Sequence, residues 1–357
     1  MKWKCGVRAN TRNIYCAPFH ADHILKISTN DGTVETLDDI ELPETGRGLW
    51  ASGALAQDNN IYYMPFSAHR ILRLNPDNDS LSSVGDALGR GVHSKYRGTV
   101  VGNDDRVYGI PHYATRIIKF DPTNPETTST VGERIVGRCG NGVLAGDGYI
   151  YAVNRFGQVL QIDTTNSDYT WIGDKIYSEM GAGWGDPIVG ADKCIYWPPS
   201  SANRVLKFDP ETQQLPSLVG DVLGTGNYKW NGGALAPNGN IYCIPHYSTQ
   251  ILTIDPFKEM SMMLQNNFRQ HPQELGRLFV KDEECDETFY CSAVRKFGIE
   301  KVFKVLVEEC LPSDEEWTVT RSGSSNLPLF MAAASCENSA VSVIYHLLRR
   351  NVHDVST

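Results

Sequence analysis

Histidine side chains recur at comparable places along the chain before residue 257. His112 and His246 each follow an Ile-Pro pair, whereas His20 lies one residue further from Pro18. Imidazoles can bind metals or move protons, but the shifted spacing of His20 argues against one shared metal site. We expect these side chains mainly to hydrogen-bond the backbone of a neighbouring structural unit, and a role in ligand binding stays open.

Arginines also repeat, because Arg70, Arg116 and Arg204 each lie five residues after a proline. The planar guanidinium group recognises carboxylates and phosphates, and Arg and aromatic residues anchor protein interfaces. The sequence has no nucleophile elbow, phosphate-binding loop, HExxH or paired-carboxylate motif, so we predict no catalytic residue, no metal and no cofactor. The candidate binding residues are His20, Arg70, Tyr96, His112, Arg116, Trp184, Asn203, Arg204 and His246.

These residues belong to a repeat. NIYCIPHYSTQILTIDP at 240–256 recurs, with changes, as NIYCAPFHADHILKIST, NIYYMPFSAHRILRLNP, RVYGIPHYATRIIKFDP and CIYWPPSSANRVLKFDP. A shorter copy without proline, YIYAVNRFGQVLQIDT, begins at Tyr149. The apolar residue before the shared tyrosine recurs every 43 to 47 residues, at Ile14, Ile61, Val107, Ile150, Ile195 and Ile241. This period is typical of a propeller blade or of a helical repeat.

The residue types favour strands, because β-branched and aromatic residues gather in each copy and Pro and Gly separate them. In the last copy GGALA predicts an inner strand, Asn238-Gly239 a tight turn, and residues 241–244 a second strand that Pro245 ends. Residues 251–254 predict a third strand. Fourth strands are predicted at 82–86, 170–174 and 216–221, and each of these segments ends in Val-Gly-Asp or Ile-Gly-Asp.

The prediction is therefore mainly β: a six-bladed β-propeller at residues 1–257, with blades of about 46 residues and four antiparallel strands each. The last repeat lacks Val-Gly-Asp. Residues 259–265 are either a degraded fourth strand or the start of a helix, and in the second case the ring closes with three strands or is incomplete. The loops after the second strands and the blade-joining loops are expected on one rim, where binding residues concentrate.

The repeats resemble the propeller superfamily that includes Kelch, streptogramin-lyase-like and sugar-lactonase-like proteins. The Gly-His and Trp-Asp pairs of WD repeats are missing, and the double glycine of Kelch occurs once, at Gly232-Gly233. No metal-binding carboxylates of the lactonase-like enzymes can be matched residue by residue. The resemblance thus implies an architecture without a specific activity.

Residues 258–357 differ in composition and predict a small α-helical domain. IEKVFKVLVEE at 299–309 has helical spacing of its apolar residues, and LPLFMAA at 327–333 resembles the TPLHxAA motif of ankyrin repeats. The Thr and His of that motif are absent. A more divergent copy is predicted around 290–309, and a plain helical cap on the last blade is the alternative.

Composition limits the partners. The net charge of −9 argues against nucleic acid, which needs a basic stripe. No apolar run is long enough to span a membrane, the start has no secretory signal pattern, and nine cysteines without CxxC spacing suit a reducing compartment. We expect a cytoplasmic protein.

The leading hypothesis is a non-enzymatic scaffold that binds other proteins through the propeller rim and the ankyrin-like tail. The alternative is a propeller lyase or hydrolase that acts on a small anionic substrate at the rim, so a small anionic ligand is the second kind of partner expected. A third interpretation, that the chain is a fragment of a longer gene product, follows from the abrupt start of the first repeat and the missing last Val-Gly-Asp.

Overall fold

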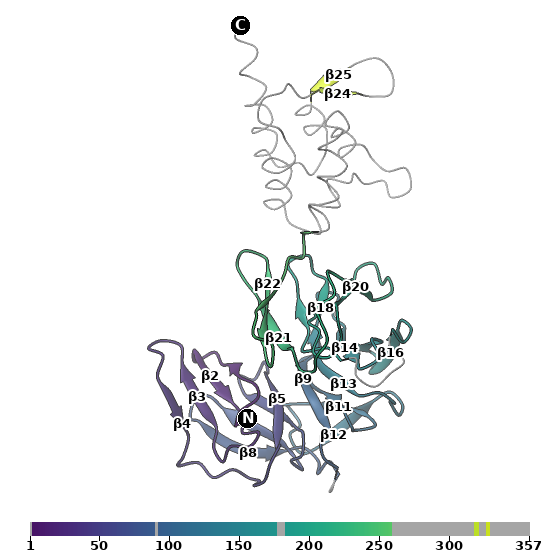
Figure 1. Cartoon of the computed structure of the whole chain (residues 1–357). Helices are drawn as coiled ribbons and strands as arrows, with labels where there is room; N and C mark the ends of the chain where they lie inside the picture. Colours follow the sequence, from purple (N-terminus) through teal and green to yellow (C-terminus); the bar gives the residue numbers. More distant parts are fainter. Residues whose placement is uncertain (1, 90–91, 177–182, 259–317, 321–325, 329–357) are drawn as a thin grey trace. The chain divides into compact units, whose positions relative to one another are not determined.

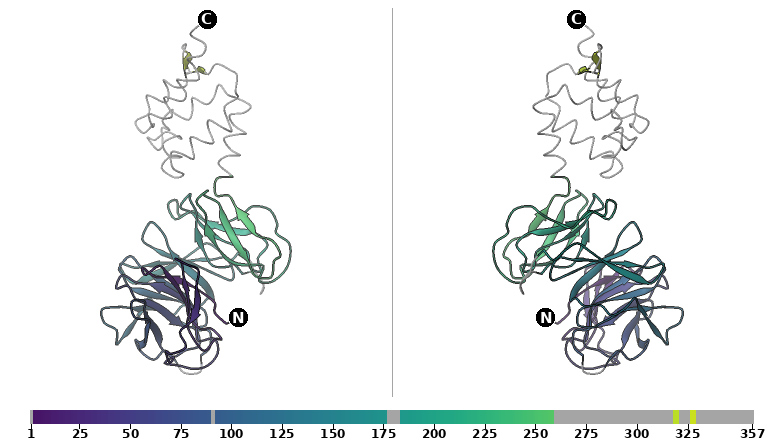
Figure 2. Two further views of the ribbon diagram at one scale, coloured as in Figure 1. Left: turned by 90° about the vertical axis from the view of Figure 1, so that its left-hand side faces the viewer. Right: turned by 90° about the vertical axis from the view of Figure 1, so that its right-hand side faces the viewer.

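The computed structural model describes residues 2–89, 92–176, 183–258, 318–320 and 326–328. The first compact unit of the chain comprises Met1–Gly190, Cys194–Pro237 and Ile241–Ile254. Within it, six antiparallel sheets follow one another in chain order (Figures 1 and 2). The six-bladed propeller is therefore confirmed, and each sheet is called a blade below.

Five blades have four strands each, paired in sequence order. Blade 1 contains β1 (Val7–Arg8), β2 (Asn13–Cys16), β3 (Leu25–Ser28) and β4 (Val34–Thr36). Blade 2 contains β5 (Trp50–Leu55), β6 (Ile61–Pro65), β7 (Ile71–Asn75) and β8 (Ser80–Val84), and blade 3 contains β9 (Tyr96–Val101), β10 (Val107–Pro111), β11 (Ile117–Phe120) and β12 (Thr128–Val131). Blade 4 contains β13 (Cys139–Leu144), β14 (Ile150–Asn154), β15 (Val159–Asp163) and β16 (Asp168–Ile172), and blade 5 contains β17 (Ile188–Val189), β18 (Ile195–Trp197), β19 (Val205–Phe208) and β20 (Ser217–Val219).

Blade 6 has three strands in the described part of the chain: β21 (Trp230–Leu235), β22 (Ile241–Pro245) and β23 (Leu252–Ile254). The predicted fourth strand or helix at 259–265 lies outside the described residues. So do the predicted helices of the ankyrin-like segment, which stay predictions. The predicted domain boundary at residue 257/258 is also still a prediction. The second compact unit includes a separate two-stranded ladder, in which β24 (Thr318–Thr320) pairs with β25 (Asn326–Pro328).

Local sequence explains where these strands turn and end. The residue two positions before the repeated apolar residue adopts positive φ in all six blades, at Arg12, Asn59, Asp105, Gly148, Lys193 and Gly239. The Asn-Gly turn predicted at Gly239, with φ of 82°, is confirmed. Three second strands, β6, β10 and β22, end at the repeated proline, which has no N–H to continue the ladder.

The hydrophobic core lies between blades. The tyrosine of the second strand points toward the following blade, where Tyr62 packs on Phe120 at 5.1 Å between ring centroids and Tyr151 on Phe208 at 5.2 Å. Five apolar clusters join blades 1 and 2, 2 and 3, 3 and 4, 4 and 5, and 5 and 6. No cluster among the described residues joins blade 6 to blade 1. Consecutive blades therefore depend on one another for burial of their apolar faces.

Candidate functional site

The loops between the second and third strands are held against the start of the inner strand of the same blade. The backbone N–H of His112 donates to the Lys95 carbonyl at 2.7 Å, and that of His246 donates to the Lys229 carbonyl at 2.8 Å. Lys95 and Lys229 directly precede β9 and β21. These hydrogen bonds place the crossover loops and the blade-joining loops on one rim.

Two predicted histidines connect neighbouring blades. His20 Nδ1 accepts a hydrogen bond from the Gly48 N–H at 3.1 Å. His112 Nδ1 lies 3.0 Å from the Cys139 carbonyl oxygen, to which it donates. Both partners belong to the chain at the start of the next blade, as expected for a structural role. His246 is exposed, and its ring contacts Tyr247 at 4.6 Å between centroids.

The predicted arginines hydrogen-bond within their own blades, Arg70 and Arg116 through their side chains and Arg204 through its backbone carbonyl. The guanidinium of Arg70 donates to the Gly85 carbonyl, and that of Arg116 donates to the Gly132 carbonyl at 3.4 Å. The Arg204 carbonyl accepts a hydrogen bond from Trp184 Nε1 at 3.1 Å. The guanidinium groups of Arg70 and Arg116 are thus each held by their own blade, and the three equivalent arginines are not among the residues that line the cleft described below.

The remaining predicted residues help to build the blades. Tyr96 and Trp184 are each 5% exposed and belong to apolar clusters between blades. The Asn203 carbonyl accepts from the Leu223 N–H at 2.7 Å. The structure describes all nine predicted residues. Two of them, His112 and Trp184, line the cationic cleft described next, and the other seven do not.

The rim carries a cleft between blades 3 and 4, formed by two adjoining pockets of about 310 and 170 Å³. Both pockets share His112, Arg138, Asn154 and Arg155. The larger extends outward to Arg134, Val136, Phe156 and Lys175, and the smaller extends inward to Arg97 and Trp184. We call this pair of pockets the cationic cleft.

No Asp or Glu is among the described residues that line the cationic cleft. The ion pairs within the described part of the chain include none of its basic residues. Aromatic rings hold these groups instead: the Arg138 guanidinium lies 3.9 Å from the Tyr113 ring centroid, and Arg155 and Lys175 lie 4.7 and 5.0 Å from that of Phe156. Several positive charges thus face one space whose described lining contains no carboxylate, although the buried Asp186 interacts electrostatically with Arg97.

Buried charges continue from the cleft toward the inner strands. Arg97 Nη2 donates to Asn231 Oδ1 at 3.5 Å, whereas its buried Nε has no hydrogen-bond partner among the described residues. Burial lowers the pKa of Lys4 to about 8, and burial raises the pKa of Asp186. Burial, and then the nearby cations Arg97, Arg138 and Lys4, lower the pKa of His112 to about 4. The imidazole beside the cleft is therefore neutral at pH 7.

Solved structures with this arrangement of sheets are propellers of several functions. A streptogramin B lyase matches with a TM-score of 0.55 and 15% identity over 68% of this chain and 75% of that chain. An inactive variant of virginiamycin B lyase from Staphylococcus aureus, with quinupristin, matches with a TM-score of 0.56 and 14% identity over 71% and 84%. YCF48 bound to a peptide matches with a TM-score of 0.51 and 11% identity over 70% and 76%.

The chain shares the fold of these propeller proteins. At these identities the likeness extends to the fold alone, and the neighbours include a lyase as well as a peptide-binding protein. No family model and no curated protein matches the sequence. Among the described residues, no helix has the length and apolar character needed to cross a membrane.

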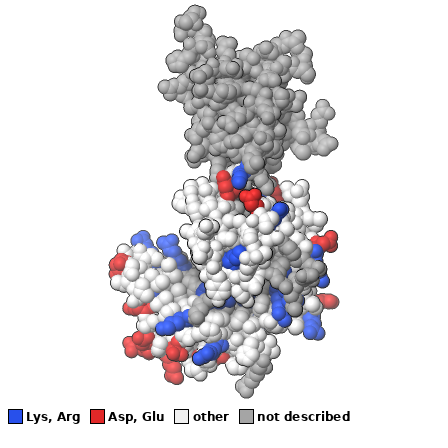
Figure 3. Space-filling model, viewed as in Figure 1, with Lys and Arg blue, Asp and Glu red and all other residues white. Residues whose placement is uncertain are grey.

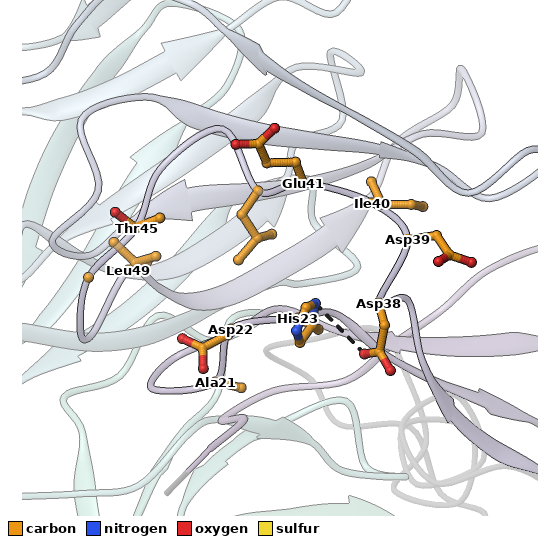
Figure 4. A pocket seen from close by; sticks show the side chains of 11 residues that line it. Ala21, Asp22, His23, Asp38, Asp39, Ile40, Glu41, Thr45 and Leu49 are labelled. Carbon is orange, nitrogen blue, oxygen red and sulfur yellow. Dashed lines mark ion pairs between the residues drawn. The ribbon is translucent and has the colours of Figure 1, made fainter.

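A second rim pocket, of about 340 Å³, lies beside blades 1 and 2 and has the opposite charge (Figure 4). Its lining includes Asp22, Asp38, Asp39 and Glu41, with His23 Nδ1 3.7 Å from Asp38 Oδ1. The carboxylates lie apart around the pocket in Figure 4, and the described residues contain no group of three side chains arranged to hold a metal ion. Charges of both signs are also spread over the propeller face in Figure 3.

The sequence did not predict the cationic cleft, although two signals were present. The copy beginning at Tyr149 departs from the others by lacking proline, and its crossover carries Arg155 and Phe156. The joining loop before β13 contains Arg134 and Arg138. Residues that differ between repeats mark a specialised place better than residues that recur, since each blade needs the recurring ones for its own turns.

Proposed function

We propose that this protein is a non-catalytic binding protein whose rim holds an acidic segment of a partner protein in the cationic cleft. The observation that carries the proposal is the set of unpaired basic side chains on a chain of net charge −9. Repulsion between Arg134, Arg138 and Arg155 is relieved when a carboxylate or phosphate enters between them, and Arg binds such groups through paired hydrogen bonds.

Features around the cleft favour a protein segment over a small molecule. Val136, at the outer edge, is 86% exposed, and Tyr113 is 47% exposed. Exposed apolar and aromatic side chains beside arginines are typical of protein interfaces. The two pockets share four lining residues and together extend from Val136 to Trp184, which suits an extended peptide.

The enzymatic alternative needs a proton-transfer group at the same cleft. Apart from the arginines, His112 is the titratable side chain that lines both pockets. With a pKa of about 4 it is a weak base at neutral pH. Its Nδ1 is also engaged by the Cys139 carbonyl. These features favour binding over a lyase or hydrolase reaction.

The test is a binding measurement with the full chain and fluorescein-labelled acidic peptides, with and without phosphoserine. We expect Arg138→Ala with Arg155→Ala to weaken binding about tenfold or more, because charge-assisted hydrogen bonds contribute about 1.5–3 kcal/mol each. Rising salt should weaken binding to the parent more than to this variant.

The matched control is Arg8→Ala with Arg47→Ala, which removes the same charge from exposed positions away from the cleft. If both double variants lose affinity equally, general electrostatics explains the binding and the cleft assignment is wrong. Breakdown of a small anionic substrate that depends on His112 would support the enzymatic alternative instead.

A further inference from the structure

Blade 6 leaves uncovered the sheet face that the other blades bury. In blades 1 to 5, the residue two positions after the shared tyrosine is buried against the following blade; these residues are Ala17, Met64, Ile110, Val153 and Pro198. The counterpart in blade 6, Ile244, is 62% exposed. The repeat therefore placed an apolar side chain on this face, and no following blade covers it within the described part of the chain.

The third strand of blade 6 shows the same difference. The apolar residue that begins or directly precedes the third strand is at most 4% exposed at Ile24, Ile71, Ile117, Val159 and Val205. Ile251, at the same place in blade 6, is 65% exposed. Leu235 of β21 and Tyr242 of β22 are also exposed, at 43% and 37%. One face of blade 6 is thus an apolar surface built like the five buried ones.

Blade 1 leaves the complementary face uncovered. In blade 2 the side chains that point toward the preceding blade, Leu72 and Leu74, are fully buried. Their counterparts Leu25 and Ile27 are only partly buried, and Val34 of β4 is 63% exposed. The described residues therefore form five blade-to-blade interfaces and two unmatched halves of a sixth.

The histidines of the rim show the same difference between blade 6 and the covered blades. His112 reaches the backbone of the following blade at Cys139, and His246 occupies the same place after the proline of blade 6. His246 is exposed and contacts only rings of its own blade among the described residues, Tyr228 and Tyr247. Among the described residues, no hydrogen bond of the His246 ring to another blade corresponds to the one that His112 makes.

The length of a structural neighbour gives a separate measure of the gap between blades 6 and 1. Because 71% of this chain's 357 residues matches 84% of the S. aureus lyase chain, roughly 50 residues of that fold have no counterpart here. This is close to the 43 to 47 residues of one repeat. The unmatched length is therefore about that of one repeat.

We propose that the open seam between blades 6 and 1 binds one four-stranded β-sheet blade carried by another polypeptide. Such a blade is apolar on both faces, since it meets Ile244 and Ile251 on one side and Leu25 and Ile27 on the other. The five interfaces within the chain already show the required geometry, so the seam continues an existing mode of packing. A flat apolar peptide could cover one face but not both.

The experiment adds the missing element in its simplest form. Residues 49–94, which comprise blade 2 and the loop that follows it, are duplicated before Lys2, so that Ser94 precedes Lys2-Trp3 as it naturally precedes Lys95-Tyr96. We expect the melting temperature of the full chain to rise by roughly 5 °C or more, because both seam faces become buried. The same segment as a separate labelled peptide should bind the parent chain.

The control is Ile244→Lys with Ile251→Lys. Both side chains are exposed in the parent, so the double substitution should leave its melting temperature within about 1 °C, while it should abolish the gain in the fusion and the binding of the peptide. Equal melting temperatures for the fusion and the parent, with the added segment cleaved rapidly by protease, would overturn the proposal.

The oligomeric state distinguishes a second copy of this chain as the occupant. If the parent sediments as a dimer that Ile244→Lys with Ile251→Lys converts to a monomer, the seam is a self-association surface and the proposal is wrong. Binding of acidic peptides at the cationic cleft should be the same in all these variants, because blades 3 and 4 are unchanged, so failure here leaves the proposed function untouched.

Discussion

His112 shows how one side chain can hold the fold together and also limit its chemistry. Its Nδ1 joins blade 3 to Cys139 of blade 4, and its ring lies beside Arg97 and Arg138. Because these surroundings disfavour the imidazolium, the side chain serves as a neutral wall of the cationic cleft. The neighbouring charges, and not the histidine, are then available for an anion.

This setting predicts a pH dependence of stability. The pKa of His112 is about 4 in the folded chain and about 6.5 when unfolded, so between these values the unfolded state binds more protons and acid favours unfolding. Stability should fall as the pH drops from 6.5 to 4, by at most about 3 kcal/mol for this group. In His112→Gln, urea denaturation at pH 7 and pH 4.5 should show a smaller difference. An unchanged difference would assign the acid sensitivity to other groups.

At the scale of strands, the inner strands need glycine where atoms of the adjacent second strand lie too close for a Cβ atom. A Cβ atom on Gly53 of β5 would lie 2.3 Å from the Tyr63 ring, and one on Gly233 of β21 would lie 2.6 Å from the Tyr242 carbonyl oxygen. The small-residue pattern GGALA predicted an inner strand for this reason. The structure adds the aromatic ring that lies against the glycine, which no local pattern indicates.

Gly53→Ala should therefore destabilise the propeller by about 1–3 kcal/mol, the usual cost of overpacking, because Tyr63 is fully buried and cannot move away. Gly146→Ala is the matched control, since a Cβ there has no neighbour within 4 Å. Denaturant unfolding of both variants checks the prediction. Equal losses would show that chain entropy at glycine, rather than the contact with Tyr63, sets the effect.

At the scale of the whole propeller, stability should vary with distance from the open seam. Among the residues that the structure describes, apolar clusters cover both faces of blades 2 to 5 but only one face of blade 1 and one of blade 6. Elements with fewer buried apolar contacts open at a lower free energy. The end blades should thus open before the ring as a whole unfolds.

Native-state hydrogen exchange tests this order. Amides of β22 and β23 should exchange at least about tenfold faster than those of β10 and β11, which occupy the same positions in the fully covered blade 3. The blade fusion described above should slow exchange in β22 while leaving β10 unchanged. Uniform protection across all six blades would contradict the idea that the seam is a weak point.

The sequence by itself determined the repeat, the strands, their turns and the position of the rim, because these follow from local alternation, from proline and from residues that accept positive φ. It selected the recurring residues Arg70 and Arg116 as binding candidates, although they bind their own blade, and it did not select the varying residues Arg138 and Arg155. Only the tertiary structure decided that those varying residues meet in one cleft, and that Ile244 and Ile251 remain uncovered. Both depend on which blades become neighbours around the ring, and a repeated local pattern, being the same in every blade, carries no information about where the ring is left open.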